Sequence, residues 1–457
     1  MLQKKIYLLK IIKIELWVLF LTVILFFLLL MSFGALVGHK LEAPKNRFPI
    51  MSEVAYFIAE IPSNFIEILQ NKKAKELQVE DRFPNLSGFE GNPLQEEAYL
   101  LLSRYNGDIK QSIVELVDLR SFEVKKTWRP DIDKINELVD TTIPDFKNLL
   151  RDKYSSRYNI IHPFLTEDGG LIFQNESPLV KIDADSQLVW QNQTDIFHHS
   201  IEQDHQGNLW VPTSLYPYQA DKKYLGSKIG YKDDAITKVS LDGKILFQKS
   251  VIELFIENNL EYLLFPMIDV HPKDILHLND IQPVLSDGPH WKRGDVFISL
   301  RGVSMIILYR PSTNEIIWRK AGLSAAQHDV DILDDHRISI FNNNSYLLHD
   351  GRKVDGNNEI IIYNFNSDSS SKYFDESLIQ YDLRTINQGL NQIFDNGELF
   401  IEEQNYGRLL YFNKNATINW QYINRANNGN VYGLNWSRML SGSKDIKKVH
   451  KVLNIED

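Results

Sequence analysis

The feature that most restricts the fold of this chain is a repeated unit of short strands between residues 162 and 366. Each copy passes through a turn rich in Asp and Gly and continues into an apolar strand such as LIF, LWV, VFI or ISIF. The copies begin at His162, His199, His277 and His328. About four short strands per copy, each copy too small to bury both of its faces, is typical of the blades of a β-propeller.

Two more copies without the leading histidine extend the repeat in both directions. They occupy residues 96–128 and 397–421. The count is therefore about six blades. We predict an all-β chain, with a six-bladed β-propeller domain over residues 91–445 and a C-terminal tail over 446–457. Residues 430–440 are expected to return and complete the first blade. Two local helical insertions are expected at residues 131–140 and 252–264.

The N-terminal segment predicts a membrane anchor. Residues 17–38 form a nearly continuous apolar stretch, and about 20 such residues are enough to cross a bilayer. Lysines at positions 4, 5, 10 and 13 precede the stretch, which predicts a cytoplasmic N-terminus by the positive-inside rule. Residues 1–16 are then a short cytoplasmic basic segment, and everything after Gly38 lies in the periplasm or outside the cell. A cleaved signal peptide is the competing interpretation.

Residues 39–90 are expected to form a juxtamembrane helical and linker segment, with the helix broken at Pro62. Composition narrows the remaining possibilities. The 457-residue chain has no cysteine, which excludes disulfides, thiolate metal sites and a cysteine nucleophile. Its net charge is −10, and no basic stripe follows the N-terminus, so nucleic acid is not a predicted partner.

The predicted functional site follows from the position of the histidines. The first strand of every propeller blade lines the central channel, so residues at the start of several blades converge. We therefore expect His162, His199, His277 and His328 near one axis, with His199 rather than its neighbour facing the channel. Arg301 interrupts an apolar strand, and a buried guanidinium needs an anion or a carboxylate partner.

Three uses of such a site remain open at this point. One is a metal centre, which is weakly supported because only His271 and His277 have a suitable spacing. Another is a general acid and base pair. The third is a histidine nucleophile that transfers a compact oxyanion group, with a guanidinium and N–H donors stabilising the developing charge. In that case Asp329 and Asp331 are predicted to orient His328.

Several segments together resemble one known family. They are HHSIEQDHQGNLWV, DILHLNDI, DVFISLRGVSMIILYRPSTNEIIWR, QHDVDILDDHRISIFNN and YGLNWSRML. In this order they resemble the bacterial arylsulfate sulfotransferases that work without the nucleotide sulfate donor PAPS. The resemblance covers residues 92–440 and implies a six-bladed propeller that moves a sulfuryl group from an aryl sulfate ester to a phenolic acceptor.

The resemblance also implies roles for individual residues. His328 would be the nucleophile that is transiently sulfated, Arg301 and His277 would bind sulfate oxygens, and His199 would act as donor or acid/base. The further substrate-binding candidates are Asn279, Arg438, His162 and Asp329. No metal and no cofactor are predicted, and the chain has no P-loop motif. The alternatives are a membrane-anchored propeller that serves as a non-catalytic binding or scaffold module, and a metal-dependent hydrolase.

Overall fold

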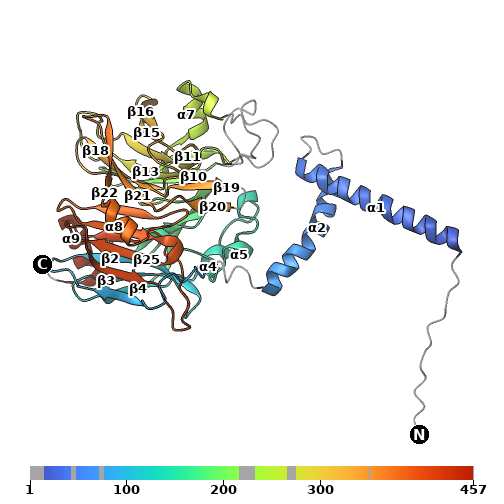
Figure 1. The fold of residues 1–457 in the computed structure, drawn as a ribbon, viewed down its shortest axis with the longest axis horizontal. Helices are drawn as coiled ribbons and strands as arrows, with labels where there is room; N and C mark the ends of the chain where they lie inside the picture. The colour runs from blue at the N-terminus through green and yellow to red at the C-terminus, as the bar shows by residue number, and fades with distance from the viewer. Residues whose placement is uncertain are drawn as a thin grey trace, which may run out of the picture. The chain divides into compact units, whose positions relative to one another are not determined.

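The structure is a computed structural model that describes residues 15–42, 48–70, 77–215, 232–264, 274–348 and 351–455. It divides into two compact units, Met1–Lys72 with Ser227–Ile229, and Lys73–Gly226 with Gly230–Asp457. The described part of the first unit is helical, and the second unit is built mainly from β-sheet (Figure 1).

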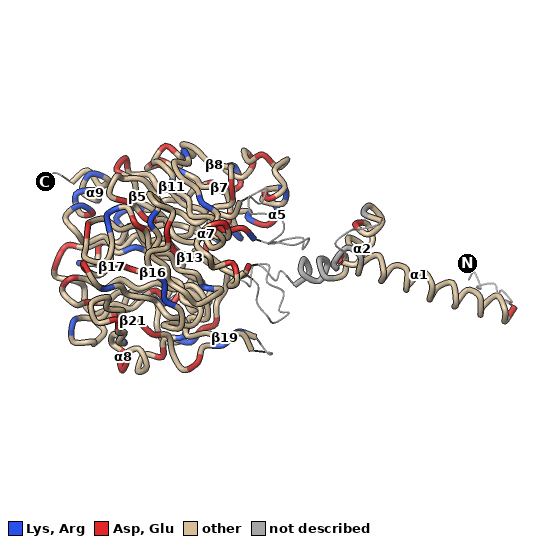
Figure 2. The backbone as a smooth tube through the Cα atoms, turned by 90° about the horizontal axis from the view of Figure 1, so that it is seen from above, with Lys and Arg blue, Asp and Glu red and all other residues tan. Residues whose placement is uncertain are grey.

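The first unit contains the helices α1 (Leu16–Glu42) and α2 (Pro49–Gln70). The 23 residues Leu16–Gly38 are long and apolar enough to cross a membrane, and none of the most apolar window is buried. Figure 2 shows α1 as a stretch with almost no charge. This helix fits a single-pass anchor or a signal sequence.

The break expected at Pro62 is wrong, because α2 runs through this proline. A proline removes only one helical N–H donor, so the hydrogen bonds on both sides can carry the helix past it.

The second unit is an all-β, propeller-like arrangement of antiparallel sheets (Figure 1). Two sheets have four strands that follow one another along the chain from the innermost to the outermost. The first contains β13 (Leu278–Pro283), β14 (Val296–Leu300), β15 (Met305–Arg310) and β16 (Glu315–Ala321). The second contains β17 (Asp329–Ile332), β18 (Arg337–Asn342), β21 (Glu359–Asn364) and β22 (Ser369–Tyr373).

In each of two more sheets, a strand from the beginning of this unit pairs with a strand from its end. One contains β23 (Leu390–Ile393), β24 (Leu399–Glu403), β25 (Arg408–Phe412), β26 (Ile418–Ile423) and the early strand β1 (Gly88–Gly91). The other contains β2 (Tyr99–Asn106), β3 (Gln111–Asp118), β4 (Glu123–Trp128) and the late strand β27 (Arg438–Leu440). Tyr99 pairs with Leu440, which confirms that residues 430–440 return to the first of these repeats. Such closure leaves fewer unpaired strand edges.

An eight-stranded sheet completes the unit. Its strands are β5 (Ile161–Leu165), β6 (Leu171–Gln174), β7 (Ser177–Ile182), β8 (Leu188–Phe197), β9 (Glu202–Gln203), β10 (Leu209–Ser214), β11 (Asp234–Val239) and β12 (Ile245–Ser250). The pairing of β8 with β10 involves only Phe197 with Thr213 and Ile196 with Ser214, so the sheet consists of two meanders joined at one corner. A hairpin of β19 (Ser345–Leu348) and β20 (Gly351–Val354) lies between β18 and β21.

Short helices connect the sheets. They are α4 (Ile132–Glu137), α5 (Leu149–Asp152), α7 (Val251–Glu257), α8 (Asp375–Gln380) and α9 (Ser443–Leu453), with 3-10 turns η1 (Pro144–Phe146), η2 (Glu261–Leu264), η3 (Arg301–Val303) and η4 (Gln404–Tyr406). Both expected helical insertions are confirmed by α4, and by α7 with η2. Residues 446–457, predicted as a tail, include most of α9, whose Val449 is fully buried.

The core lies between neighbouring sheets, where apolar faces meet. One cluster, for example, combines Trp128 and Leu116 with Leu165 and Phe173 from the next sheet. Acidic and basic residues alternate along the backbone of this unit without a continuous run of Lys and Arg (Figure 2). The cores therefore fix the sheets around a centre, and the side chains of the innermost strands meet there.

Candidate functional site

One backbone feature repeats near the start of the strands β5, β9, β13, β17, β23 and β27, each of which lies at one end of a run of paired strands. Within or just before each of them, one non-glycine residue has a positive φ: His162, His199, His277, Ala326, Gln388 and Trp436, at φ values from 45° to 62°. This left-handed conformation is uncommon for such residues. Three of the four predicted histidines share it, whereas His328 follows Ala326 by two residues. The expectation that all four occupy equivalent positions is therefore wrong for His328.

The site is centred on three histidines that are far apart in the sequence. One ring nitrogen each from His199, His277 and His328 can be chosen so that all three lie within 4.8 Å of one another. The ring centres of His199 and His277 are 5.3 Å apart, and those of His199 and His328 are 6.3 Å apart. His199, His277 and His328, which are far apart in the sequence, therefore form one compact cluster of imidazole rings.

Each of these rings uses its Nδ1 atom for a different partner. His277 Nδ1 lies 2.6 Å from Asp274 Oδ2, and His328 Nδ1 lies 2.6 Å from Asn343 Oδ1. His199 Nδ1 lies 2.8 Å from the Nδ1 of His198, whose Nε2 lies 3.3 Å from Asp234 Oδ1. Because the three Nδ1 atoms have these partners, we infer that the Nε2 atoms are the ones available to a ligand in the space between the three rings, here called the shared space.

The pKa values of two of these histidines are lowered strongly. Burial lowers the pKa of His328 well below 6.5, and the nearby Arg301 and His277 lower it further. Burial also lowers the pKa of His199 well below 6.5, with His198, His277, Lys232 and His328 adding to the effect. Both imidazoles are therefore neutral at pH 7, which is the form that can act as a nucleophile or as a single N–H donor.

Arg301 lies next to this cluster. Its backbone N–H donates to the His277 carbonyl at 3.0 Å. Its Nε is buried and has no hydrogen-bond partner among the described residues. Burial and the neighbouring Arg352 lower the pKa of Arg301 to about 10, so it still carries its charge at pH 7. Because an unpaired, partly buried guanidinium is costly, its position favours an anionic ligand.

The predicted residues His162 and Arg438 lie in a second group, around Glu202. The Nδ1 of His162 accepts the N–H of Ile201 at 3.1 Å, and its Nε2 is 3.4 Å from Glu202 Oε1. Arg438 donates to Glu202 at 3.1 Å and to the carbonyl of Pro163. These two residues are therefore not members of the three-histidine cluster.

Asn279 is fully buried beside the cluster. Its amide nitrogen donates to the Gln327 carbonyl at 2.7 Å, and its Oδ1 has no partner among the described residues. Its direct contact with a substrate stays a prediction. His271, the possible metal-ligand partner of His277, lies outside the described residues.

Asp329 does not orient His328, contrary to the sequence-based expectation. Its Oδ2 accepts the N–H of Asn391 at 2.9 Å, so the carboxylate joins two innermost strands. Successive residues of a strand point to opposite faces, which directs Asp329 away from the ring that precedes it. The His328 ring is instead contacted by the amide oxygen of Asn343. The sequence offered one signal for this residue, because when the second strands of two repeats, DVFISLR and RISIFNN, are aligned, the position of Arg301 corresponds to Asn343.

Four carboxyl groups lie along β9, β13 and β17: that of Asp280 is buried, and those of Glu202, Asp329 and Asp331 are half-buried. Burial raises the pKa of Asp280 to about 7, with Glu202 adding to the effect. Burial and the neighbours Asp280 and Glu202 raise the pKa of Asp331 well above 3.8, while Arg438 opposes this. Like charges this close cannot all ionise freely, so some of these groups hold protons near neutral pH.

We expect Asp331→Asn to stabilise the protein at pH 8. The folded-state pKa is raised, so the cost of ionising this carboxyl is absent below about pH 4 and grows as the pH rises towards the folded-state value. The gain in unfolding free energy should be of order 1 kcal/mol at pH 8 and smaller at pH 5. Thermal unfolding at both pH values checks this. If Asp331→Asn raised the unfolding free energy equally at pH 5 and at pH 8, the charge of Asp331 would not be the cause of the stabilisation.

Together, the sheets and the site define a β-propeller-like protein in which three histidine rings, those of His199 and His328 neutral, lie beside one guanidinium. The sequence matches the model of the arylsulfotransferase (ASST) family over residues 162–425. The chain therefore belongs to the arylsulfotransferase family, and it is an arylsulfate sulfotransferase by this family assignment. No curated protein sequence is similar to it.

Solved structures with a similar fold are distant. A protein of unknown function from Bacteroides caccae has 11% identity and a TM-score of 0.43, with 72% of this chain and 94% of that chain covered. A streptogramin B lyase has 11% identity and a TM-score of 0.38, with 77% and 96% covered. The hydrazine synthase of Kuenenia stuttgartiensis has 10% identity and a TM-score of 0.35, with 69% and 77% covered. At these values the likenesses carry no functional argument.

Proposed function

We propose that this protein transfers a sulfuryl group from an aryl sulfate ester to a phenol through a transient sulfo-histidine on His328. The observation that carries the proposal is the neutral His328 ring in a cluster with His199 and His277, next to Arg301, whose Nε has no partner among the described residues. We further propose that the propeller has six blades, since six innermost strands each begin beside one left-handed residue.

In the first half-reaction, an unprotonated ring nitrogen of His328 attacks the sulfur of the donor ester. The nitrogen–sulfur bond forms, the bond from sulfur to the aryl oxygen breaks, and the phenol leaves after taking up a proton. Arg301 and His277 bind the sulfuryl oxygens and stabilise charge in the transition state. The N–H of neutral His199 donates a hydrogen bond to the leaving phenolate oxygen, and the phenolate takes its proton from water.

In the second half-reaction, neutral His199 takes the proton of the acceptor phenol and then releases it to water, while the phenol oxygen attacks the same sulfur. The nitrogen–sulfur bond breaks, and His328 returns to its neutral form. No nucleotide donor takes part in either step. A neutral attacking imidazole needs no deprotonation, so transfer should continue at pH 6, and its acid limb should lie below the usual histidine pKa.

The proposal is tested with a chromogenic aryl sulfate and the full-length protein in detergent. Release should depend on an added phenol and follow ping-pong kinetics. Without acceptor, the peptide that contains His328 should gain one sulfuryl group by mass spectrometry. An absence of release with every donor and acceptor would favour the non-catalytic scaffold instead.

A second candidate function is metal-dependent hydrolysis of a sulfate ester. Three histidine nitrogens within 4.8 Å of one another could also hold a metal ion, and hydrogen bonds to the other ring nitrogens are common among metal-binding histidines. The nearby charges of Arg301 and Lys232 oppose a bound cation. Release of phenol into water that is abolished by a chelator would favour this candidate, whereas chelator-insensitive transfer to phenol would favour the first.

We also propose that α1 is an uncleaved anchor, with the propeller in the periplasm or outside the cell. The lysines before α1 and the 23-residue span support this orientation. The chain contains no cysteine, so a single cysteine introduced at the exposed Leu285 would report the side. It should react with an impermeant maleimide in intact spheroplasts, and protection until lysis would contradict the orientation.

A further inference from the structure

We infer that Asn343 is a positioning residue that holds His328 in one tautomer, with the proton on Nδ1 and the lone pair of Nε2 free for attack. The inference rests on the proposed function for its catalytic consequence. The tautomer itself depends only on hydrogen bonds of the folded protein.

The orientation of the Asn343 amide is fixed by its surroundings. Its Nδ2 donates to the carbonyl of Gln388 at 2.7 Å and to the carbonyl of Thr385 at 3.2 Å. Carbonyl oxygens can only accept, so the amide nitrogen must face them and the amide oxygen must face His328. Since that oxygen is only an acceptor as well, the Nδ1 atom of His328 at 2.6 Å has to carry hydrogen.

The protonation state of His328 completes the argument. The pKa of this ring is lowered well below 6.5, so one of its two nitrogens is unprotonated at pH 7. With the hydrogen held on Nδ1, the unprotonated atom is Nε2. This is the nitrogen that the Asn343 contact leaves for the shared space of the three histidines.

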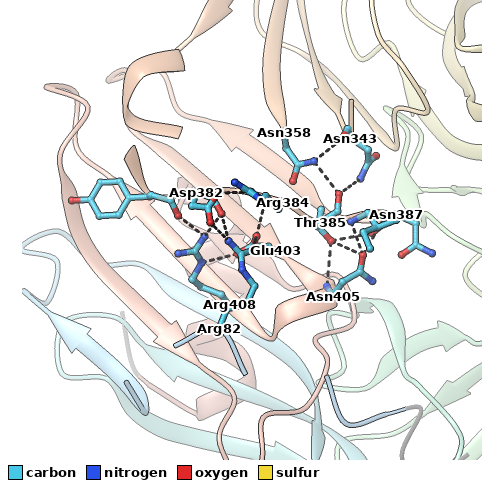
Figure 3. Close-up of polar contacts among 12 residues, drawn as sticks. Arg82, Asn343, Asn358, Asp382, Arg384, Thr385, Asn387, Glu403, Asn405 and Arg408 are labelled. Carbon is cyan, nitrogen blue, oxygen red and sulfur yellow. Dashed lines mark hydrogen bonds and ion pairs between the residues drawn. The ribbon is translucent and has the colours of Figure 1, made fainter. Parts of the chain in front are cut away.

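The segment of residues 385–388, which supplies these two carbonyls, is held by contacts of its own (Figure 3). The Asn358 amide, fully buried, donates to the Thr385 carbonyl at 2.9 Å and to the Asn343 carbonyl at 2.6 Å. The Thr385 hydroxyl donates to Asn405 Oδ1 at 2.8 Å. The same Asn405 oxygen accepts the N–H of Asn387 at 3.0 Å.

Ion pairs hold the start of this segment (Figure 3). Glu403 Oε1 accepts the N–H of Arg384 at 2.6 Å. Glu403 is fully buried and also pairs with Arg408 at 2.7 Å and Arg82 at 2.9 Å. The Asn343 side chain is therefore fixed by several independent contacts, and its role is to hold a ring in one state rather than to touch the substrate.

The test combines a spectroscopic measurement with kinetics on the full-length protein. Selective labelling of the histidine rings with ¹⁵N distinguishes the two neutral tautomers, and the His328 signal is assigned by its loss in His328→Ala. We expect the wild type to show the Nδ1–H tautomer at pH 7.5. In Asn343→Leu, which removes the acceptor, we expect a mixture of tautomers and a fall in kcat of roughly 100-fold.

A second variant separates positioning from a purely structural role. Asn343→Asp keeps an acceptor but adds a negative charge, which stabilises the imidazolium, so the acid limb of kcat/KM should move up by about one pH unit or more. Asn424→Leu is the matched control, because the buried Asn424 amide, like that of Asn343, donates to backbone carbonyls, and none of its hydrogen bonds among the described residues reaches a histidine. It should leave the tautomer and the pH profile unchanged.

The outcomes separate the inference from the proposed function. An Nε2–H tautomer in the wild type, or an unchanged tautomer and rate in Asn343→Leu, would overturn the positioning role even if transfer occurs. An Nδ1–H tautomer that is lost in Asn343→Leu, in a protein that transfers no sulfuryl group, would support the positioning of His328 and overturn only the proposed function.

Discussion

His328→Ala should lower the rate of sulfuryl transfer by at least about 10⁴-fold, because the nucleophile and the covalent intermediate are lost together. Acceptor-dependent release from a chromogenic aryl sulfate measures this effect. The control is His205→Ala, which removes an exposed histidine in the turn before β10 and should leave the rate unchanged.

Chemical rescue makes the His328 prediction more specific. The alanine variant leaves a space where the ring was, and free imidazole added at millimolar concentration should enter it and restore part of the activity. The fold should survive, since the sheets form separate clusters of buried residues and the substitution affects the centre alone. Wild-type rates in His328→Ala would show that His328 is not the nucleophile.

The strand repeat was predictable because short segments of alternating apolar and polar residues, separated by turns rich in Asp and Gly, are compatible with few folds other than repeated antiparallel sheets. Its return strand was predictable because a propeller usually closes when a late strand of the chain completes the first blade. The exact register was not. The His328 position differs from those of His199 and His277 by two residues, and a shift of this size depends on bulges such as the one between Leu278 and Asp280.

The cluster of His199, His277 and His328 was predictable from the repeat, because equivalent strand starts converge on a common centre. The partners of the rings were not, since they come from segments whose course depends on tertiary contacts. Asp274 precedes β13 at the end of a long connection, and Asn343 is oriented by carbonyls near Thr385. Asp329 was the more obvious neighbour of His328 in sequence, but alternation along the strand turns it to the other face.

Arg301 provides the second large expected effect. In Arg301→Met, kcat/KM should fall by roughly 10²- to 10³-fold, because a charge that stabilises the transition state is removed from a partly buried site. The acid limb should also move to higher pH. Arg301 lowers the pKa of His328, so without this cation the ring is protonated, and inactivated as a nucleophile, at a higher pH than in the wild type. A pH profile of kcat/KM for both proteins measures the two effects together.

Two comparisons show whether charge or geometry is responsible. Arg301→Lys keeps the charge, so the acid limb should stay near its wild-type position, but it lacks the planar fork that binds two oxygens at once, so the rate should still fall. Arg319→Met removes an exposed arginine of β16 and serves as the matched control.

Stability should change in the opposite direction to activity. The Arg301 Nε has no partner among the described residues, so methionine at this position removes a desolvation cost, and the melting temperature of Arg301→Met should equal or exceed that of the wild type. A site selected only for stability would not retain, next to three imidazoles, a guanidinium whose buried Nε has no partner in the described part of the chain. A variant that loses stability while keeping its activity and pH profile would show that Arg301 supports the fold and does not bind the anion.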